Sequence, residues 1–276
     1  MSTEETDQAY FWKPKNLQNI TLFKAHFTNF SCEKHVHDEF SITLIDKGLT
    51  HFFFKGMNYK FTDHTIVTLN PDEIHSCGAL SDFGYQYKVI YINPDFIYQM
   101  QKELFSTNQN NLFFSNFYLE DEYLYHKLNS LILLERNSLI SNFEFEEEMI
   151  EVLNYILLKN CKNVHTKIFI PDSILMNKAK NYINENYKED ITLDDICNEI
   201  NLSKYHFLRL FKQTFFISPH SYLMIRRVEA AKQLLQFGNS IIETSFKCGF
   251  NDQSHLSRRF KAITGITPGN YRKFFN

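Results

Sequence analysis

A chain of 276 residues is long enough for two domains, and an aromatic content of 16%, with 28 Phe and 15 Tyr, excludes an extended disordered protein. Residues 1–170 carry 14 basic and 22 acidic side chains, a net charge of −8, whereas residues 203–276 carry 12 basic and 3 acidic ones, a net charge of +9. Such a basic block in a chain of overall charge −3 is typical of a phosphate-binding surface, and the acidic half is not expected to bind DNA.

The start of the chain, residues 1–8, is polar and acidic, so it does not resemble a signal peptide. No apolar run approaches the roughly 18 residues that a membrane-spanning helix needs. The five cysteines are scattered and form no Cys-x-x-Cys pair, which favours reduced thiols. We therefore expect a cytoplasmic protein that has no membrane partner.

Residues 11–93 alternate as short β-strands do. Alternation predicts strands at residues 40–45, 50–54, 59–61, 65–69 and 85–92, separated by turns such as Asp46-Lys47-Gly48. Strands this short, about ten residues apart, predict a small β-barrel or a sandwich.

Polar side chains that could anchor a ligand gather in this β region. His35 and His37 are two positions apart, so on a strand they would point to the same face, and Glu39 and His75 are the other members of the set. Imidazole and carboxylate groups of this kind can bind a metal. A metal-free polar pocket for a small molecule and hydrogen-bonded structural histidines are the two alternatives.

Residues 95–162 change to a helical period. Leucines at helical spacing predict a helix over residues 122–136, and a second helix is expected over residues 145–162, with acidic side chains near its first turns. Residues 163–173 lack a period and contain Pro171, which predicts the interdomain linker. A helix over residues 174–187 should then pack on the next unit through the side chains of Ile174, Ala179, Tyr182 and Ile183.

One stretch near the C-terminus occurs twice. The pattern Phe-Lys, four residues, Ile-Ser/Thr-Pro, two residues, Tyr ends at Tyr222 and again at Tyr271, 49 positions later. Each copy follows a short amphipathic helix and a second helix, which is capped by Ser203 in one unit and by Asn251 or Asp252 in the other. Two short helices with a basic outer face predict a helix-turn-helix, present twice. A protein-binding stack of helical pairs is the alternative, although a solenoid usually needs three or more units.

The outward side chains of the two second helices are the expected DNA contacts. Arg209 and Arg258 occupy equivalent positions and could each bridge guanine O6 and N7, and Gln253 could bridge an adenine. Lys212, Lys261 and Arg272 suit phosphates, and solvated surface charge is the alternative for each basic residue. The full set of expected DNA contacts is Lys204, Tyr205, His206, Arg209, Lys212, Gln253, Ser254, His255, Arg258, Arg259 and Lys261.

The run from Ile191 to Lys273, closed by Gly265-Ile266-Thr267-Pro268-Gly269-Asn270-Tyr271-Arg272, resembles the DNA-binding domain of AraC/XylS-type bacterial transcription regulators. The segment His35-Val36-His37-Asp38-Glu39-Phe40 is similar to the cupin-type effector domain of the same family. This resemblance implies an α+β two-domain protein. Residues 1–165 would form a cupin-like domain for effector binding and dimerisation, with an N-terminal small β-barrel plus helices, and residues 166–276 an all-α domain with two helix-turn-helix units.

In that family a long helix joins the two units, and here it would be residues 219–236. Eighteen residues span about 27 Å at 1.5 Å per residue, so this helix could hold two recognition helices about one DNA turn, 34 Å, apart. One departure is Phe216, which stands where the second unit has Gly265. The first unit therefore lacks the residue best suited to a left-handed turn after a helix.

The resemblance implies a sequence-specific transcription regulator, more often an activator than a repressor, bound to promoter or operator DNA. We expect a small-molecule effector anchored by His35, His37, Glu39 and His75, a homodimer formed through residues 122–136, and RNA polymerase as a further partner. No cofactor or metal is expected, because Glu39 follows His37 more closely than in enzymatic cupins and the second cupin motif lacks its Gly. The rival is a metal-dependent cupin enzyme with an appended DNA-binding tail.

Overall fold

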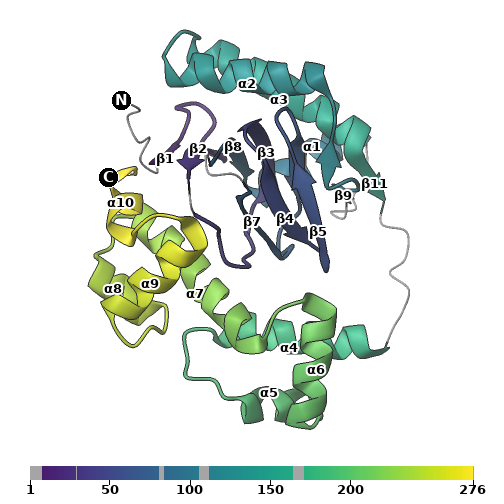
Figure 1. Ribbon diagram of the computed structural model, residues 1–276, viewed down its shortest axis with the longest axis vertical. Helices are drawn as coiled ribbons and strands as arrows, with labels where there is room; N and C mark the ends of the chain where they lie inside the picture. Colours follow the sequence, from purple (N-terminus) through teal and green to yellow (C-terminus); the bar gives the residue numbers. More distant parts are fainter. Residues whose placement is uncertain (1–7, 29, 81–83, 106–111, 164–170, 276) are drawn as a thin grey trace.

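The computed structural model describes residues 8–28, 30–80, 84–105, 112–163 and 171–275. The N-terminal part is rich in β-strands and carries three helices, and the C-terminal part is all-helical (Figure 1). The predicted α+β two-domain fold is therefore confirmed. The boundary predicted between residues 165 and 166 falls outside the described residues and stays a prediction.

The strands form two facing antiparallel sheets and one small ribbon. A six-stranded sheet has the order β1-β2-β8-β3-β6-β10, a three-stranded sheet the order β5-β4-β7, and β11 pairs with β9. Between described residues no strand ladder joins the two larger sheets, so the predicted barrel is an open sandwich. The strands are β1 (Gln8–Trp12), β2 (Ile20–Phe27), β3 (Phe40–Lys47), β4 (Thr50–Phe54), β5 (Met57–Phe61), β6 (Ile66–Leu69), β7 (His75–Ala79), β8 (Tyr85–Ile92), β9 (Leu112–Phe114), β10 (Tyr118–Leu119) and β11 (Cys161–Asn163).

Both faces of the six-stranded sheet are covered. On β3, Phe40, Ile42 and Leu44 are fully buried against helices α2 (Glu122–Arg136) and α3 (Asn142–Asn160). The alternate side chains Ser41 and Thr43 turn to the other face, which lines a cavity inside the sandwich. Because both faces are covered, the polar side chain of Ser41 is as deeply buried as the apolar side chains beside it.

The predicted helix over residues 122–136 is confirmed as α2, and α1 (Pro94–Phe105) and α3 complete this layer. The prediction that residues 95–162 are helical throughout is wrong at two places. Residues 112–119 contain β9 and β10, and the end of the helix predicted over 145–162 is strand β11. These strands pair with partners far along the chain, so runs of two or three residues gave no local signal.

The C-terminal part repeats one unit around a central helix, as predicted. Ser203 caps α6 and Asp252 caps α9, each by accepting a bond from a backbone N–H of the first turn. The side chains predicted to face inward, Phe207, Leu210 and Phe211 in one unit and Leu256, Phe260 and Ile263 in the other, are buried. The helices are α4 (Pro171–Asn186), α5 (Leu193–Ile200), α6 (Lys204–Phe215), α7 (Pro219–Gln236), α8 (Ile241–Lys247), α9 (Gln253–Thr264) and α10 (Pro268–Lys273).

Helix α4 packs on the first unit through Met176, Ala179 and Ile183, all fully buried. Ile174, which was expected to pack there too, is 46% exposed. That part of the prediction is wrong, because the buried stripe of α4 begins only at Met176. None of the helices in the described part of the chain is apolar enough over a sufficient length to span a bilayer.

Helices α6 and α9 both end at a residue in the left-handed conformation. The φ angle is 81° at Gly265 and 58° at Phe216. Phe216 thus adopts a conformation that glycine would reach more easily. Its ring lies 6.4 Å from that of Phe53, and its carbonyl oxygen accepts a 2.9 Å bond from Lys34 Nζ, so this residue contacts the β-sandwich.

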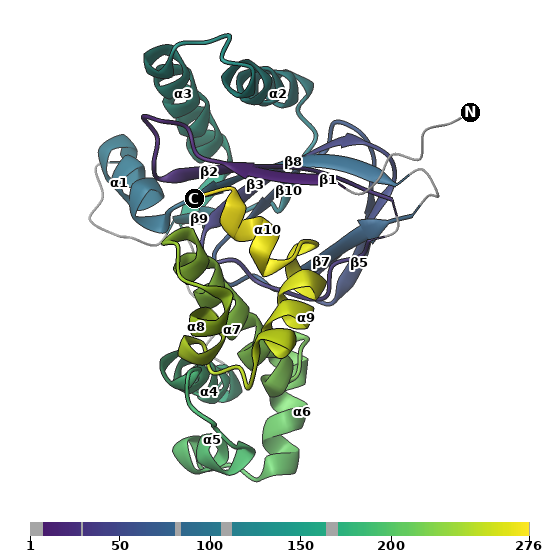
Figure 2. The ribbon, with the colours of Figure 1, turned by 90° about the vertical axis from the view of Figure 1, so that its left-hand side faces the viewer.

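Helices α7, α9 and α10 lie against the sandwich (Figure 2), and one hydrophobic core continues from the β part into the helical part. The ring of Phe11 in β1 lies 5.0 Å from that of Tyr271 in α10. The backbone N–H of Glu33 donates to the carbonyl of Ala262 in α9 at 3.1 Å. The two parts are therefore held in one closed arrangement.

Candidate nucleic-acid interface and ligand cavity

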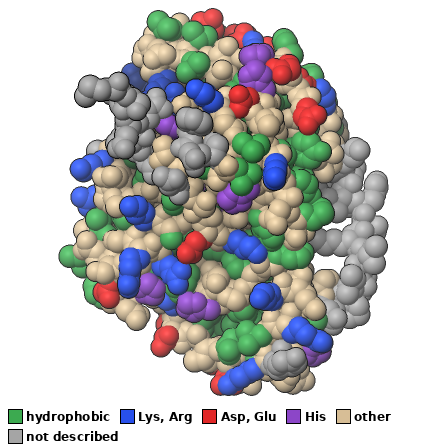
Figure 3. All heavy atoms as spheres, in the orientation of Figure 1, with side chains coloured by type: hydrophobic (Ala, Val, Ile, Leu, Met, Phe, Trp, Pro, Cys, Tyr) green, Lys and Arg blue, Asp and Glu red, His purple; other side chains and the backbone are tan. Residues whose placement is uncertain are grey.

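Helices α6 and α9 lie on the same side of α7 (Figure 2). That side is the face drawn in Figure 3, where Lys, Arg and His side chains are spread over the lower part of the molecule that holds both helices. Arg209, Lys212, Arg258 and Lys261 are exposed. No ion pair joins these four to another described residue, so their charges are available to a phosphate or a base.

The other predicted DNA contacts differ in their surroundings. Gln253 and Ser254 are exposed, whereas His206 and His255 are half-buried. Lys204 Nζ lies 2.7 Å from the Asp194 carboxylate in its own unit. The side chain of Tyr205 lies outside the described residues.

Arg259 is the one predicted contact found to interact with the N-terminal part among those described. Its guanidinium lies 3.4 Å from the Glu33 carboxylate. This pair is half-exposed and sits where the C-terminal half of α9 meets the sandwich. The N-terminal half of α9, which carries Gln253 and Ser254, takes no part in that contact.

The sandwich holds a cavity of about 60 Å³, which has room for a few water molecules. Its walls are largely aromatic, and His35, His37 and His75 form its polar side. Glu229 and Lys232 of α7 and Ile263 and Thr264 of α9 also line it. The helical part therefore contributes directly to the cavity of the β part. The aromatic lining residues are Phe11, Phe23, Phe30, Phe52, Tyr85, Tyr87 and Tyr91.

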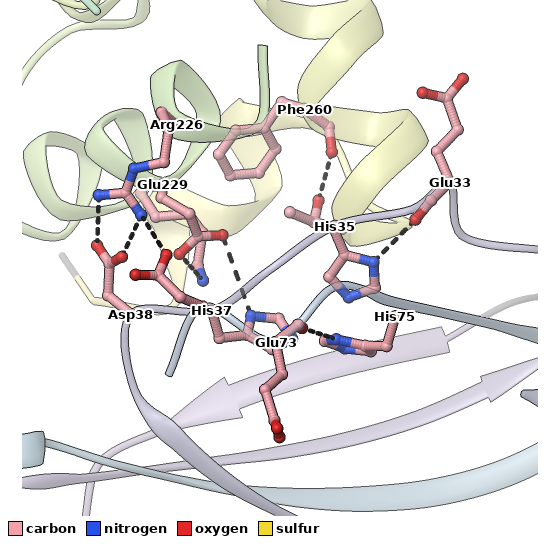
Figure 4. A network of polar contacts seen from close by, with 12 residues as sticks. Glu33, His35, His37, Asp38, Glu73, His75, Arg226, Glu229 and Phe260 are labelled. Atoms are coloured by element: carbon pink, nitrogen blue, oxygen red, sulfur yellow. Dashed lines mark hydrogen bonds and ion pairs between the residues drawn. The ribbon is translucent and has the colours of Figure 1, made fainter. Parts of the chain in front are cut away.

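The three histidines converge, although His35 and His37 do not lie on a regular strand as expected. His35 forms an isolated antiparallel bridge with His75, and His37 lies in the segment before β3. The ring centroids are 4.1 Å apart for His35 and His75, 4.8 Å for His35 and His37, and 5.0 Å for His37 and His75. Figure 4 shows the rings gathered below the helix that carries Glu229 and Arg226.

Backbone carbonyls fix two of the rings. His35 Nδ1 lies 2.8 Å from the carbonyl oxygen of Glu33, and His75 Nδ1 lies 2.9 Å from that of Glu73. In both rings Nδ1 therefore carries the proton, and Nε2 keeps its lone pair. Burial lowers the pKa of His75 to about 4 and places the pKa values of His35 and His37 well below their usual range, so all three are neutral at pH 7.

Charged groups meet this cluster from α7. Glu229 is 3% exposed, and burial raises its pKa to about 7 despite the opposing effect of Lys232. Lys232 Nζ lies 2.9 Å from the Glu229 carboxylate. Burial by itself would lower the pKa of Lys232, but Glu229 and Glu39 together raise it well above its usual value. Glu39, Glu229 and Lys232 thus form one charge cluster beside His37, in which Glu229 and Lys232 are buried and Glu39 is half-buried.

Comparison with known proteins identifies both parts. A model described as AraC-like ligand binding domain matches residues 17–153, and a helix-turn-helix domain model matches residues 196–273. The HTH-type transcriptional regulator YbfI of Bacillus subtilis is 30% identical over 227 residues, which cover 80% of this chain and 80% of that protein. The chain belongs to the AraC family of transcriptional regulators.

Three further matches extend this result. The raffinose operon transcriptional regulatory protein RafR of Pediococcus pentosaceus is 32% identical over 158 residues, which cover 56% of this chain and 57% of RafR. A crystal structure of ToxT from Vibrio cholerae superposes with a TM-score of 0.60 and 16% identity, and covers 98% of this chain and 97% of ToxT. A ToxT structure with a bound unsaturated fatty acid matches with a TM-score of 0.55 and 17% identity, covering 100% of this chain and 98% of that one. At this identity the ToxT match shows a shared fold.

In this AraC-family regulator, helix α7 also makes contacts with the β part. Arg226 of α7 forms an ion pair with Asp38 (Figure 4) and lies 3.8 Å from Asp72, and both carboxylates belong to the β part. Lys180 of α4 lies 3.5 Å from Asp72, and the Tyr222 hydroxyl is also 3.5 Å from it. These contacts were not predicted from the sequence.

A local signal for them was present. Arg226, Glu229 and Lys232 are spaced three residues apart on a helix whose other positions are largely apolar, so they fall on one face. Charges in a mostly buried helix require partners, and Arg226 has its partner Asp38 in the β part. Pairing across the two parts could not be deduced without the fold.

A second, larger hollow lies between the two parts and has a volume of about 650 Å³. Residues 70–74 and 113–115 form its β side, and Asn177, Lys180 and residues 214–216 form its helical side. This space is large enough for a small organic molecule. It contains none of the four residues predicted to anchor the effector.

Proposed function

We propose that this regulator activates transcription by docking α6 and α9 in successive major grooves of promoter or operator DNA. The placement of both helices on one side of an 18-residue α7 carries this proposal. A helix of that length spans about 27 Å, which suits recognition helices about one DNA turn apart. Activation is supported by a relative named lactose operon transcription activator from Staphylococcus xylosus, 30% identical over 127 residues, which cover 44% of this chain and 46% of that protein.

Arg209 and Arg258 read bases in this proposal, because they are exposed and occupy equivalent positions in the two units. A guanidinium can bind guanine O6 and N7 together, and Gln253 can bind an adenine. Lys212 and Lys261 bind phosphates and set the position of the protein on DNA. Lys204, Tyr205, His206, Ser254, His255 and Arg259 complete the proposed interface.

The effector binds in the cavity of the sandwich, with His35, His37 and His75 as polar anchors and Glu39 beside them. The closed arrangement leaves only about 60 Å³ there, so an organic effector requires α7 and α9 to move outward. A molecule that binds the open arrangement better than the closed one shifts the population toward the open one. Occupancy of the cavity would thereby change how the two recognition helices are presented.

The remaining assignments concern protein partners and cellular location. Helices α2 and α3 lie away from the helical part (Figure 1), and Tyr123, Phe143 and Leu139 on this layer are 72%, 72% and 70% exposed. Such apolar exposure on and just after α2 supports a homodimer to which residues 122–136 contribute. We further assign the protein to the cytoplasm, with RNA polymerase as a partner at the promoter and no enzymatic reaction.

Selection of bound DNA from a random pool, followed by gel-shift titration, tests this function. The wild type should enrich one sequence, and the double variant Arg209→Ala/Arg258→Ala should bind it at least a hundredfold more weakly. Lys102→Ala on α1 removes one exposed positive charge from the other part of the molecule and should bind as the wild type does. The absence of any enriched sequence would refute the proposal.

A further inference from the structure

The cavity holds nitrogen donors in an arrangement that suits an ion. One donor atom each of His35, His37 and His75 lies within 4.8 Å of the other two. We propose that these three imidazoles bind a divalent transition-metal ion of the zinc class and that Glu229 of α7 is the carboxylate beside it. The ion would then tie the DNA-binding part to the β-sandwich.

The hydrogen bonds of the rings support ligation. Carbonyl oxygens of Glu33 and Glu73 accept the Nδ1 protons of His35 and His75, so the lone pair of each Nε2 is free for a metal. A ligating histidine typically donates its other N–H in this way, which fixes the tautomer and the direction of the ring. Two backbone carbonyls that hold two facing rings in the same tautomer are therefore an arrangement ready for ligation.

Unsatisfied polar atoms lie on the α7 side of the cluster. His37 Nδ1, Glu39 Oε2 and Glu229 Oε1 are buried and have no hydrogen-bond partner among the described residues. His37 Nδ1 and Glu229 Oε1 are 4.0 Å apart, too far for a hydrogen bond. Buried polar atoms without partners are uncommon, and a bound ion with its water would satisfy them.

The size of the cavity and its donor atoms agree with a metal rather than with an organic molecule in the closed arrangement. Ligands about 2.05 Å from a tetrahedral ion lie about 3.4 Å from one another, so donors within 4.8 Å need only side-chain shifts to close around it. A cavity of about 60 Å³ holds an ion and a water. The carboxylates of Glu39 and Glu229 lie beside His37, and nitrogen and oxygen donors together suit a divalent ion of the zinc class.

A surface cluster that could also hold a metal, His64, Glu122 and His126, serves as the comparison. It is half-exposed or exposed, and the Glu122 carboxylate already contacts both rings, at 3.0 Å from His64 Nδ1 and 3.3 Å from His126 Nε2. Its side chains are solvated and lack the backbone bonds that fix His35 and His75. It therefore supplies a matched control on the surface.

The test is a titration of the chelator-stripped full chain with Co²⁺, whose visible absorption reports ligation, followed by displacement with Zn²⁺. The wild type should bind one equivalent. His35→Asn and His75→Asn can keep the bond to the backbone carbonyl but lose Nε2, so each should weaken binding at least tenfold. Glu229→Gln should weaken binding severalfold and change the Co²⁺ spectrum, whereas His64→Asn should leave both unchanged.

Circular dichroism of the metal-free variants checks that each folds, and two separate His→Asn variants guard against the failure of one. Binding that is absent from the wild type, unaffected by His35→Asn and His75→Asn, or lost only in His64→Asn would overturn the site. Glu229→Gln with wild-type affinity and spectrum would overturn the tie to α7. These readouts need no DNA, so their failure is distinct from failure of the proposed regulator function.

Discussion

Phe216 and Gly265 occupy the same position in the two units, where each ends a helix in the left-handed conformation. Both have positive φ, which costs a non-glycine residue about 1–2 kcal/mol. At Gly265 a Cβ atom would come within 2.6 Å of the Phe27 ring, so only glycine fits there. At Phe216 the side chain contacts Phe53, which offsets part of the strain.

We therefore expect opposite results from exchanging the residue types. Gly265→Ala should lower the free energy of unfolding by about 1–3 kcal/mol, because it adds backbone strain and crowds the Phe27 ring. Phe216→Gly should change it by less than about 1 kcal/mol, since relief of strain and loss of the Phe53 contact oppose each other. Urea unfolding of both variants measures the difference, and equal losses would contradict the strain at Phe216.

At Arg258 the geometry of the guanidinium should matter as well as its charge. Arg258→Ala should cost about 1–3 kcal/mol in binding to the selected DNA and relax preference at one base position. Arg258→Lys keeps the charge but loses the paired donors, so preference should still relax. Gel-shift titrations over a set of single-base variants decide, and unchanged preference in both Arg258 variants would reject base reading.

Lys212→Ala should instead weaken binding to all DNA sequences alike. It should also lower the slope of log affinity against log salt concentration by about one.

Elements with a local pattern could be predicted, and those defined by distant partners could not. Helices α6, α7 and α9 follow from a repeated motif, caps and helical spacing, all present within short windows. Strand β11 has three residues and exists because it pairs with β9, some 47 positions earlier. The convergence of His35 with His75 likewise depends on a bridge between segments 40 residues apart, so the histidines could be singled out from the sequence while their geometry could not.

Helix α9 has one end facing outward and the other against the sandwich, where Glu33 pairs with Arg259. In the proposed DNA interface, Glu33 would therefore compete with DNA for this guanidinium. Glu33→Gln should free the guanidinium and remove a nearby negative charge. Because the pair is half-exposed, we expect DNA affinity to rise only about 2- to 5-fold, at low salt, and the gain to shrink as salt increases. Titrations at two salt concentrations measure this. Glu103→Gln on α1 makes the same charge change elsewhere, and an equal gain there would show a mere effect of net charge.

Across the whole molecule, the closed arrangement combines a shared apolar core with a few ion pairs on α7 and α4. The core continues from Phe11 and Phe23 in the sandwich to Tyr222 and Tyr271 in the helical part. Arg226 is the most central of the charged contacts, because it faces both Asp38 and Asp72. The apolar core gives stability, and the ion pairs fix the register of α7 on the sandwich. A single substitution in the ion pairs should therefore loosen the closed arrangement without unfolding either part.

Arg226→Ala is the direct test of that closure. The guanidinium side chain is 16% exposed, whereas those of Asp38 and Asp72 are 32% and 40% exposed, so water can solvate the carboxylates left behind. We expect the variant to destabilise the closed arrangement by about 1–3 kcal/mol, less than for a fully buried pair. Hydrogen exchange should speed up on α7, and small-angle scattering should show a larger radius of gyration. Lys178→Ala removes a charge paired with Glu199 inside the helical part and should do neither. If α7 in Arg226→Ala exchanged as slowly as in Lys178→Ala, the ion pair would have no part in holding the domains together.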